Sequence, residues 1–257
     1  MIEVEDLTKK YGDLVAVDKL SFKVEKGKIW GLLGPNAAGK TTTMRILTGY
    51  MPATEGKASV GGFDVFDQPN ELKKIIGYLP ETVPLYPEMT VSDYLIFVAA
   101  IKQVPSSKRQ QALGRALKVS GLESYKSRLI ENISRGYKQR VGIAQALIHD
   151  PQVLILDEPT IGLDPAQIKE IRELIKSLKG ERTIMLSTHI LAEVTQTCDG
   201  VVIINEGKLK ASGSLEELST SFGEKEGVIL KLKKGHEEAV SSFQSIPGVD
   251  RVSRQDG

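Results

Sequence analysis

The sequence predicts an α/β fold in which a phosphate-binding loop joins a buried strand to a helix. First, an apolar run at residues 29–33 leads into Gly34, four further residues and then Gly39-Lys40-Thr41, which is the G-x-x-x-x-G-K-[ST] pattern of a P-loop. Second, the apolar run at 153–156 reads as a strand buried on both faces, as in parallel sheets. Third, residues 84–148 have helical periodicity, which predicts a helical subdomain inserted between these two strands.

The P-loop segment supplies the first candidate binding residues. They are Gly34, Pro35, Asn36, Ala37, Ala38, Gly39, Lys40, Thr41 and Thr42. Glycines allow a tight turn whose N–H groups converge on phosphate oxygens, and a helix beginning near Lys40 directs its positive end at the same anion. Lys40 can reach the β- and γ-phosphates, and the Thr41 hydroxyl can coordinate Mg²⁺. The alternative is a glycine-rich turn that matches by chance. The preceding strand and the helix-forming residues 42–47, followed by Gly49, argue against it.

Composition narrows the class of protein. The 257 residues are enough for one domain, or for one domain with a small appendage. The net charge of +1 offers no basic field for nucleic acid and no polybasic membrane patch. Cys198 is the only cysteine, which excludes an intramolecular disulfide and a cysteine-based zinc site and fits a reducing cytoplasm. We expect no signal peptide, and the apolar stretch 95–101 is far below the roughly 18 residues of a spanning helix. A membrane role would therefore depend on a partner.

The N-terminal part reads as strands. Apolar and polar residues alternate over 2–25, with a turn at Tyr11-Gly12. Tyr11 by itself is ordinary turn filler. A strand over 57–65 is interrupted at Gly61-Gly62, and a short strand at 75–79 ends before Pro80-Glu81.

Three helices are expected between residues 84 and 148. Thr90 and Asp93 form a capping-box-like start, followed by apolar residues at 91, 95, 98 and 101. A second apolar face covers residues 112–119 and ends at Gly121. The third helix covers 134–148 and stops before Asp150-Pro151.

The α/β alternation resumes at residue 153. Asp164-Pro165 predicts a helix start, with an apolar stripe to residue 178 and an end at Gly180. Strands are expected at 183–187, 201–204 and 208–211, and residues 214–217 again have capping-box form. Beyond residue 221 the pattern weakens to a strand at 228–232, a helix at 237–243 and a strand at 249–252. We find no site chemistry there.

Two adjacent carboxylates follow the buried strand at 153–156. A P-loop enzyme needs a carboxylate to hold Mg²⁺, usually at the end of a parallel strand beside the P-loop, and Asp157 has that position. Glu158 can orient and deprotonate a water that attacks the γ-phosphate. The alternative, in which Asp157 caps a strand end and Glu158 is solvated, is disfavoured by the P-loop.

A second anion-directed segment covers residues 134–140. It places the hydroxyl of Ser134 and the small Gly136 at a helix N-terminus. An N-capped surface helix would give the same pattern. Two phosphate-directed sites separated by a helical insert suggest that they face each other across two chains.

Together these segments resemble the ATP-binding subunit of an ABC transporter. Segment 34–42 is similar to its Walker A motif, 153–158 to Walker B, 134–139 to the signature loop, 161–164 to the D-loop and 187–189 to the switch-histidine segment. Tyr11 matches the aromatic residue that stacks on adenine. The resemblance spans residues 1–217, so we expect a domain at 1–220 and an extension at 221–257. Segments 77–81 and 134–140 look most like the gliding-motility-associated and drug-exporter-like subgroup.

The resemblance implies a RecA-like core with an N-terminal antiparallel β-subdomain, and ATP and Mg²⁺ as ligands. It implies a head-to-tail dimer of ATP-binding subunits, in which Ser134, Gly136 and Gln139 face the nucleotide held by the other chain, while His189 positions Glu158 and water. It further implies polytopic membrane partners, a place at the cytoplasmic face of the membrane, and ATP hydrolysis that energises transport, most simply export. The alternative is an ATPase of the same fold doing mechanical or assembly work on a membrane complex.

Three positions depart from the family pattern. Ala37 replaces the usual glycine, which is tolerable at negative φ and costs about 1 kcal/mol at positive φ. Arg135 replaces the second glycine of the signature and brings a charge to the phosphates or the dimer seam. Glu81 replaces the usual glutamine. A carboxylate there can still bind Mg²⁺, so Glu81 is a switch, catalytic and metal candidate.

Other residues receive plainer interpretations. Pro84, Leu85, Tyr86 and Pro87 give the segment 83–89 the character of a loop that contacts a membrane subunit, although a rigid surface loop would look the same. His149 is expected as a helix-end residue and His236 as a surface residue.

Overall fold

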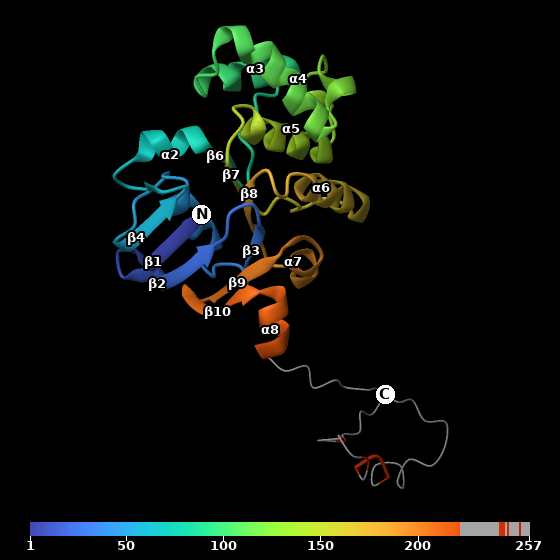
Figure 1. Ribbon diagram of the computed structural model, residues 1–257. Coiled ribbons are helices and arrows are strands. Elements are labelled where there is room, and N and C mark those ends of the chain that lie inside the picture. Colours follow the sequence, from blue (N-terminus) through green and yellow to red (C-terminus); the bar gives the residue numbers. More distant parts are fainter. Residues whose placement is uncertain (222–241, 245, 247–251, 253–257) are drawn as a thin grey trace. The chain divides into compact units, whose positions relative to one another are not determined.

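Figure 1 shows the computed structural model, which describes residues 1–221, 242–244, 246 and 252. The chain divides into residues 1–218 and residues 219–257. His236 and the elements expected at 228–232, 237–243 and 249–252 lie wholly or mostly outside the described residues. No helix among the described residues has both the length and the apolar character needed to cross a bilayer.

The N-terminal strands form a four-stranded antiparallel sheet. Its strands are β1 (Ile2–Tyr11), β2 (Leu14–Val24), β4 (Glu55–Val60) and β5 (Phe63–Asp64), in the spatial order β2-β1-β4-β5. Glycines at 61 and 62, both with positive φ, form the turn that separates β4 from β5. Buried and exposed residues alternate along much of β1 and β2, so one face of these strands lies in the core, as the sequence predicted.

The second sheet has six strands in the order β10-β9-β3-β8-β7-β6. They are β3 (Ile29–Leu33), β6 (Ile76–Leu79), β7 (Val153–Asp157), β8 (Thr183–Thr188), β9 (Gly200–Asn205) and β10 (Lys208–Ser214). All neighbouring pairs are parallel except β9 and β10. Asp157 ends β7 beside the P-loop as predicted, with its Oδ1 3.4 Å from Thr41 Oγ1, although β8 separates β7 from the P-loop strand β3. The residues that follow β8 therefore reach the centre of the site.

Helices cover the faces of the six-stranded sheet (Figure 1). They are α1 (Lys40–Leu47), α2 (Pro69–Ile75), α6 (Pro165–Ser177), α7 (Leu191–Thr197) and α8 (Leu215–Ser221). The apolar residues of β7 alternate between two cores. Val153 and Ile155 join the core shared with the four-stranded sheet and α1, whereas Leu154 and Leu156 join the core containing α6 residues. This two-sided burial explains the uninterrupted apolar run.

The helical subdomain contains α3 (Val91–Ile101), α4 (Arg109–Ser120) and α5 (Arg135–Leu147), with short 3₁₀ turns at Ser106–Lys108, Glu123–Tyr125 and Ile130–Asn132. The predicted cap is present, since Thr90 Oγ1 accepts from Asp93 N–H at 3.1 Å. Two expected core residues, Ile101 and Val119, are exposed. On α3, Tyr94 and Ala99 are buried instead, because the helix presents residues 91, 94, 95 and 99 to its neighbours. Leu85, expected to be exposed, is half-buried against this core.

Candidate functional site

The P-loop connects the end of β3 to α1, and two of its glycines are required by close approaches. A Cβ atom at Gly34 would lie 2.4 Å from the carbonyl oxygen of Ile204 on the neighbouring strand. Gly39 has φ 100°, and a Cβ there would lie 2.6 Å from the carbonyl oxygen of Ala16. The loop is thus pressed against β9 and the end of the first sheet. Only glycine at these two positions allows this packing.

Ala37 lies in the same loop with φ 64°, in the left-handed region. An L-residue with a Cβ is strained there by about 1 kcal/mol. The sequence did not determine the sign of φ at this position. The structure shows a positive φ, which is the alternative that costs free energy. Ala37 is exposed, so its methyl group recovers little of that cost by packing.

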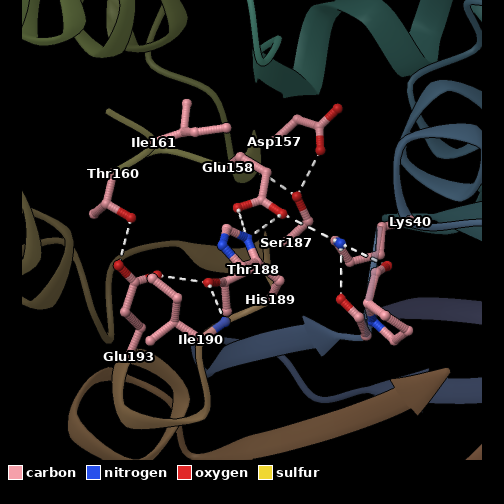
Figure 2. Close-up of polar contacts among 12 residues, drawn as sticks. Lys40, Asp157, Glu158, Thr160, Ile161, Ser187, Thr188, His189, Ile190 and Glu193 are labelled. Carbon is pink, nitrogen blue, oxygen red and sulfur yellow. Dashed lines mark hydrogen bonds and ion pairs between the residues drawn. The ribbon is translucent and has the colours of Figure 1, made fainter. Parts of the chain in front are cut away.

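Lys40 is buried. Its side chain lies beside Glu158 (Figure 2). Its ammonium donates to the carbonyl oxygens of Gly34 at 2.8 Å and Pro35 at 3.1 Å, and it lies 3.3 Å from Glu158 Oε1. The loop therefore provides its own acceptors for the lysine donors. A phosphate would replace the carboxylate as the counter-charge.

Asp157 is fully buried at the end of β7. Its Oδ1 accepts from Ser187 Oγ at 2.5 Å and from Thr41 Oγ1 at 3.4 Å. Its Oδ2 is buried without a hydrogen-bond partner among the described residues. Such an orphaned carboxylate oxygen beside a hydroxyl is suited to Mg²⁺, which prefers one or two carboxylates completed by water and phosphate. The described residues contain no cluster of three or more His, Cys, Asp or Glu able to hold a metal alone.

Glu158 follows with φ 48°, a rare conformation for a residue with a side chain. The strained backbone turns its carboxylate towards both Lys40 and His189 (Figure 2). His189 Nδ1 lies 3.1 Å from Oε2 and 3.3 Å from Oε1 of Glu158. Ser187 connects the two acids, because its Oγ accepts from Glu158 N–H at 2.9 Å while donating to Asp157. The structure thus brings together Lys40, Glu158 and His189, as the sequence predicted.

Glu81 lies at the same edge of the sheet. The last pair between β6 and β7 joins Leu79 to Leu156, so Glu81 comes just beyond the strand end, near the level of the two acids. Its side chain is exposed and has no hydrogen bond or ion pair among the described residues. Its metal and catalytic roles stay predictions.

The signature segment begins α5. Ser134 is the N-cap, its Oγ accepting from Tyr137 N–H at 3.4 Å, and it is exposed. Gly136 packs against α6, where a Cβ would lie 2.7 Å from the Gln167 side chain. Gln139, predicted to contact nucleotide, is buried and donates from Nε2 to the carbonyl of Pro159 at 2.8 Å. Within this chain Gln139 therefore supports the loop after Glu158.

Arg135 contacts the D-loop of its own chain. Its Nη2 donates to the carbonyl oxygen of Ile161 at 3.2 Å. The guanidinium also covers Gly162, which has φ 68° and where a Cβ would lie 2.3 Å from the group. Arg135 thus connects α5 to the segment that follows Glu158.

Tyr11 ends β1 and is 44% exposed. Its hydroxyl donates to Met51 Sδ at 3.2 Å, and the ammonium of Lys9 lies 5.4 Å from the ring centroid. The ring is accessible to a stacked base, and that role remains a prediction.

Three features escaped the sequence reasoning. The bridging role of Ser187 needs the tertiary pairing of β7 and β8. Glu193 lies on α7, a short helix that was not predicted, and its carboxylate accepts hydroxyls from Thr160 and Thr188. His149, read as a plain helix-end residue, is half-buried with Nε2 against the Ile76 carbonyl at 3.0 Å. Burial lowers the pKa of His149 to about 4, with a further contribution from Lys102.

Comparison with known proteins gives a consistent result. The family model described as "ABC transporter" matches residues 17–161. The bacitracin transport ATP-binding protein BcrA of Bacillus licheniformis is 44% identical over 81% of this chain and 68% of its own length. The linearmycin resistance ATP-binding protein LnrL of Bacillus subtilis is 32% identical over 98% and 82%, respectively. The dimeric post-hydrolysis structure of the ATP-binding cassette MJ0796 with ADP and Pi superposes with a TM-score of 0.74, at 25% identity, covering 84% of this chain and 99% of that one.

Proposed function

Because this chain belongs to the ABC transporter family as an ATP-hydrolysing, ATP-binding subunit, we propose that it acts in a head-to-tail dimer that drives export through separate polytopic membrane subunits. The observation that carries the proposal is the convergence of Lys40, Glu158 and His189 at one sheet edge, while Ser134 stands exposed elsewhere on the chain. A complete site needs both regions.

Glu158 is the general base. It lies within hydrogen-bond reach of His189, which orients it, and it is drawn to Lys40 when no phosphate is present. Thr41, Asp157 and Glu81 would hold Mg²⁺. The ion would neutralise charge on the phosphates while Lys40 holds their β- and γ-oxygens. Ser187 keeps Asp157 and the backbone of Glu158 in fixed relation, so the metal ligand and the base stay aligned.

The dimer follows from the exposed end of α5. In the described part of the chain the Ser134 hydroxyl caps its own helix, and a partner's γ-phosphate would meet this helix end together with Gly136. In a two-fold arrangement each contact occurs twice, so two identical sites form from complementary halves. The dimeric cassette MJ0796 supports this arrangement.

A membrane partner has a suitable surface on the helical subdomain. Tyr86, Phe97 and Ile101 are all exposed, and the Tyr86 ring lies 5.5 Å from that of Phe97. Beside the end of α3 is a cavity of about 310 Å³ lined in part by Lys73, Lys102 and Tyr50. Burial and the neighbouring Lys73 lower the pKa of Lys102, so a partner's carboxylate would be favourable there. We assign this surface to the cytoplasmic segment of the membrane subunit, with the chain peripheral at that face.

Export as the direction is supported by the relatives, whose names refer to bacitracin transport and linearmycin resistance. The transported compound would be selected by the membrane subunit.

The decisive experiment is recovery of the tagged chain from detergent-solubilised membranes of its source, followed by identification of bound proteins. We expect a stoichiometric polytopic partner, and Tyr86→Ser with Ile101→Ser should reduce its recovery. Leu14→Ser, which changes an exposed leucine on β2, is the matched control. Recovery of only soluble or single-span proteins would instead favour mechanical work on a membrane complex.

A further inference from the structure

Glu193 is a buried acid that the mechanism above does not use. It lies in the first turn of α7 and is 7% exposed. No ion pair among the described residues involves it. A carboxylate removed from water without a cation is costly unless hydrogen bonds satisfy it. The arrangement of its hydrogen bonds therefore matters.

Each carboxylate oxygen of Glu193 accepts a hydrogen bond from a threonine hydroxyl (Figure 2). One threonine lies in the loop after β7, and the other lies at the end of β8. Thr160 Oγ1 donates to Oε1 at 2.5 Å, and Thr188 Oγ1 donates to Oε2 at 2.6 Å. Thr160 and Thr188 are themselves buried. Thr188 Oγ1 also accepts from Ile190 N–H at 3.1 Å, which fixes the backbone on the far side of His189.

The two threonines stand next to the reacting groups in sequence. Thr160 follows Glu158 by two residues, and Thr188 directly precedes His189. Neither Glu158 nor His189 touches Glu193 through the contacts of their own side chains, which go to Lys40 and to each other. Glu193 thus links the loop after β7 to the end of β8 through the two threonine hydroxyls.

We propose that Glu193 is a positioning residue that fixes His189 relative to Glu158 by holding Thr160 and Thr188 together. This inference rests on the proposed roles of Glu158 and His189. The carboxylate is well suited to this task because it offers two acceptor oxygens, whereas a glutamine offers one acceptor and one donor. Glu193→Gln keeps nearly the same volume but removes the charge and forces one of the two threonine hydroxyls to change from donor to acceptor, which disturbs the arrangement.

The test is steady-state ATPase kinetics of Glu193→Gln in the assembled protein. We expect kcat to fall roughly tenfold to a hundredfold, because small displacements of catalytic groups have such effects. KM for ATP should change less than about twofold, since Lys40 and the P-loop keep their contacts. Thr160→Val and Thr188→Val each remove one hydroxyl at constant shape. Each should lower kcat. A double variant that combines either change with Glu193→Gln should lower kcat by a smaller factor than the product of the two single-variant factors.

Two further measurements separate positioning from simple stability. Asp199→Asn is the matched control, because Asp199 follows the same helix and accepts from Ile29 N–H and Lys179, away from Glu158. It should lower the melting temperature but not kcat. The ring resonances of His189, one of three histidines, should shift in Glu193→Gln and Thr188→Val, while those of His149 stay in place.

The proposal is overturned if Glu193→Gln keeps the wild-type kcat and His189 resonances, or if kcat falls only in proportion to folded protein, as in Asp199→Asn. If Glu193→Gln does not fold, the two valine variants decide by the same criteria. Failure of the proposed function would look different, since Glu158→Gln would then retain turnover.

Discussion

The two phosphate-directed regions of this chain, the P-loop site and the start of α5, differ in how many contacts their polar groups make within the chain. The P-loop site is the engaged region. At the P-loop, Lys40 is buried and its donors meet Gly34, Pro35 and Glu158. At the start of α5, Ser134 is exposed, and among the described residues its side chain makes the bond that caps its own helix. One region is assembled by a single chain, whereas the other has a free face that a second chain can use.

The engaged region contains a buried ion pair. Lys40 Nζ and Glu158 Oε1 lie 3.3 Å apart, and both side chains are buried. If Lys40 holds phosphate as proposed, we expect ATP binding to separate this pair and to leave Glu158 with its contact to His189.

The largest expected effect is that of Glu158→Gln, which removes the base and half of the buried ion pair. Turnover should fall by roughly a hundredfold or more, because an amide cannot accept the proton of the attacking water. ATP binding should persist or tighten, since Lys40 no longer has a competing carboxylate. Single-turnover hydrolysis and nucleotide titration measure the two effects separately.

Glu173→Gln is the control for this substitution, because Glu173 is an exposed acid on α6 with only a 3.9 Å pairing to Lys176. It should leave both quantities unchanged. Near wild-type turnover in Glu158→Gln would remove the assignment of the base, and ATP-dependent dimerisation of that variant should be visible by size-exclusion chromatography.

The second prediction tests whether the two regions meet across chains. Lys40→Ala should be inactive because its P-loop cannot hold phosphate, and Ser134→Arg because a bulky cation blocks the end of α5. Mixing the two should restore one intact site in each mixed dimer, giving roughly a quarter of wild-type activity at equal amounts. ATPase activity as a function of the mixing ratio measures this.

The mixed sample must exceed the sum of the two separate variants. If it does not, Ser134 does not serve the other chain's P-loop. A rescue that depends on dilution would further identify dimer formation as the step that completes the site.

Local patterns predicted part of the engaged region, and the family resemblance added the rest. The P-loop spacing indicates Lys40, and the buried run before Asp157 indicates the two acids, whereas the role of His189 was implied by the resemblance. The structure brings Lys40, Glu158 and His189 together. The strand order did not follow from local pattern. The insertion of β8 between β3 and β7 is a tertiary fact, and it is the reason Ser187 can bridge both acids.

The missed elements share a physical cause. Helices α2 and α7 have seven residues each, too short for an apolar stripe to repeat. Ile101 fits helical spacing from Val91, yet it is exposed because the end of α3 extends past its neighbours' core. The contact between Arg135 and the D-loop depends on packing α5 beside α6, which no spacing within either segment reports.

A moderate effect is expected for Arg135→Ala, which disconnects the D-loop from α5. The amides of Ile161 and Leu163 bond to carbonyls of Glu158 and Thr160 within this loop. Without the guanidinium over Gly162 these bonds should open more often, so we expect about tenfold faster hydrogen exchange there and a few-fold loss of turnover.

Lys138→Ala is the matched control for Arg135→Ala, since it removes the same charge one turn further along α5 without a side-chain contact to the D-loop. Its exchange rates at Ile161 and Leu163 should equal those of the wild type. Equal acceleration in both variants would show that charge alone, and not the contact with Ile161, controls the loop.

The smallest effect is expected at the engaged region itself, in Ala37→Gly. Glycine relieves the strain at φ 64° but gains chain entropy in the unfolded state, and the two terms partly cancel. We expect a net gain of about 0.5 kcal/mol in the free energy of unfolding, measured by urea denaturation without nucleotide. Ala38→Gly is the control. Ala38 is buried against Gly34 and its φ is not in the left-handed region, so the same change should destabilise the protein. A loss of stability in Ala37→Gly would mean that the alanine pre-orders the loop more than it strains it. The P-loop would then depend on Ala37 for the order that keeps Lys40 beside Glu158.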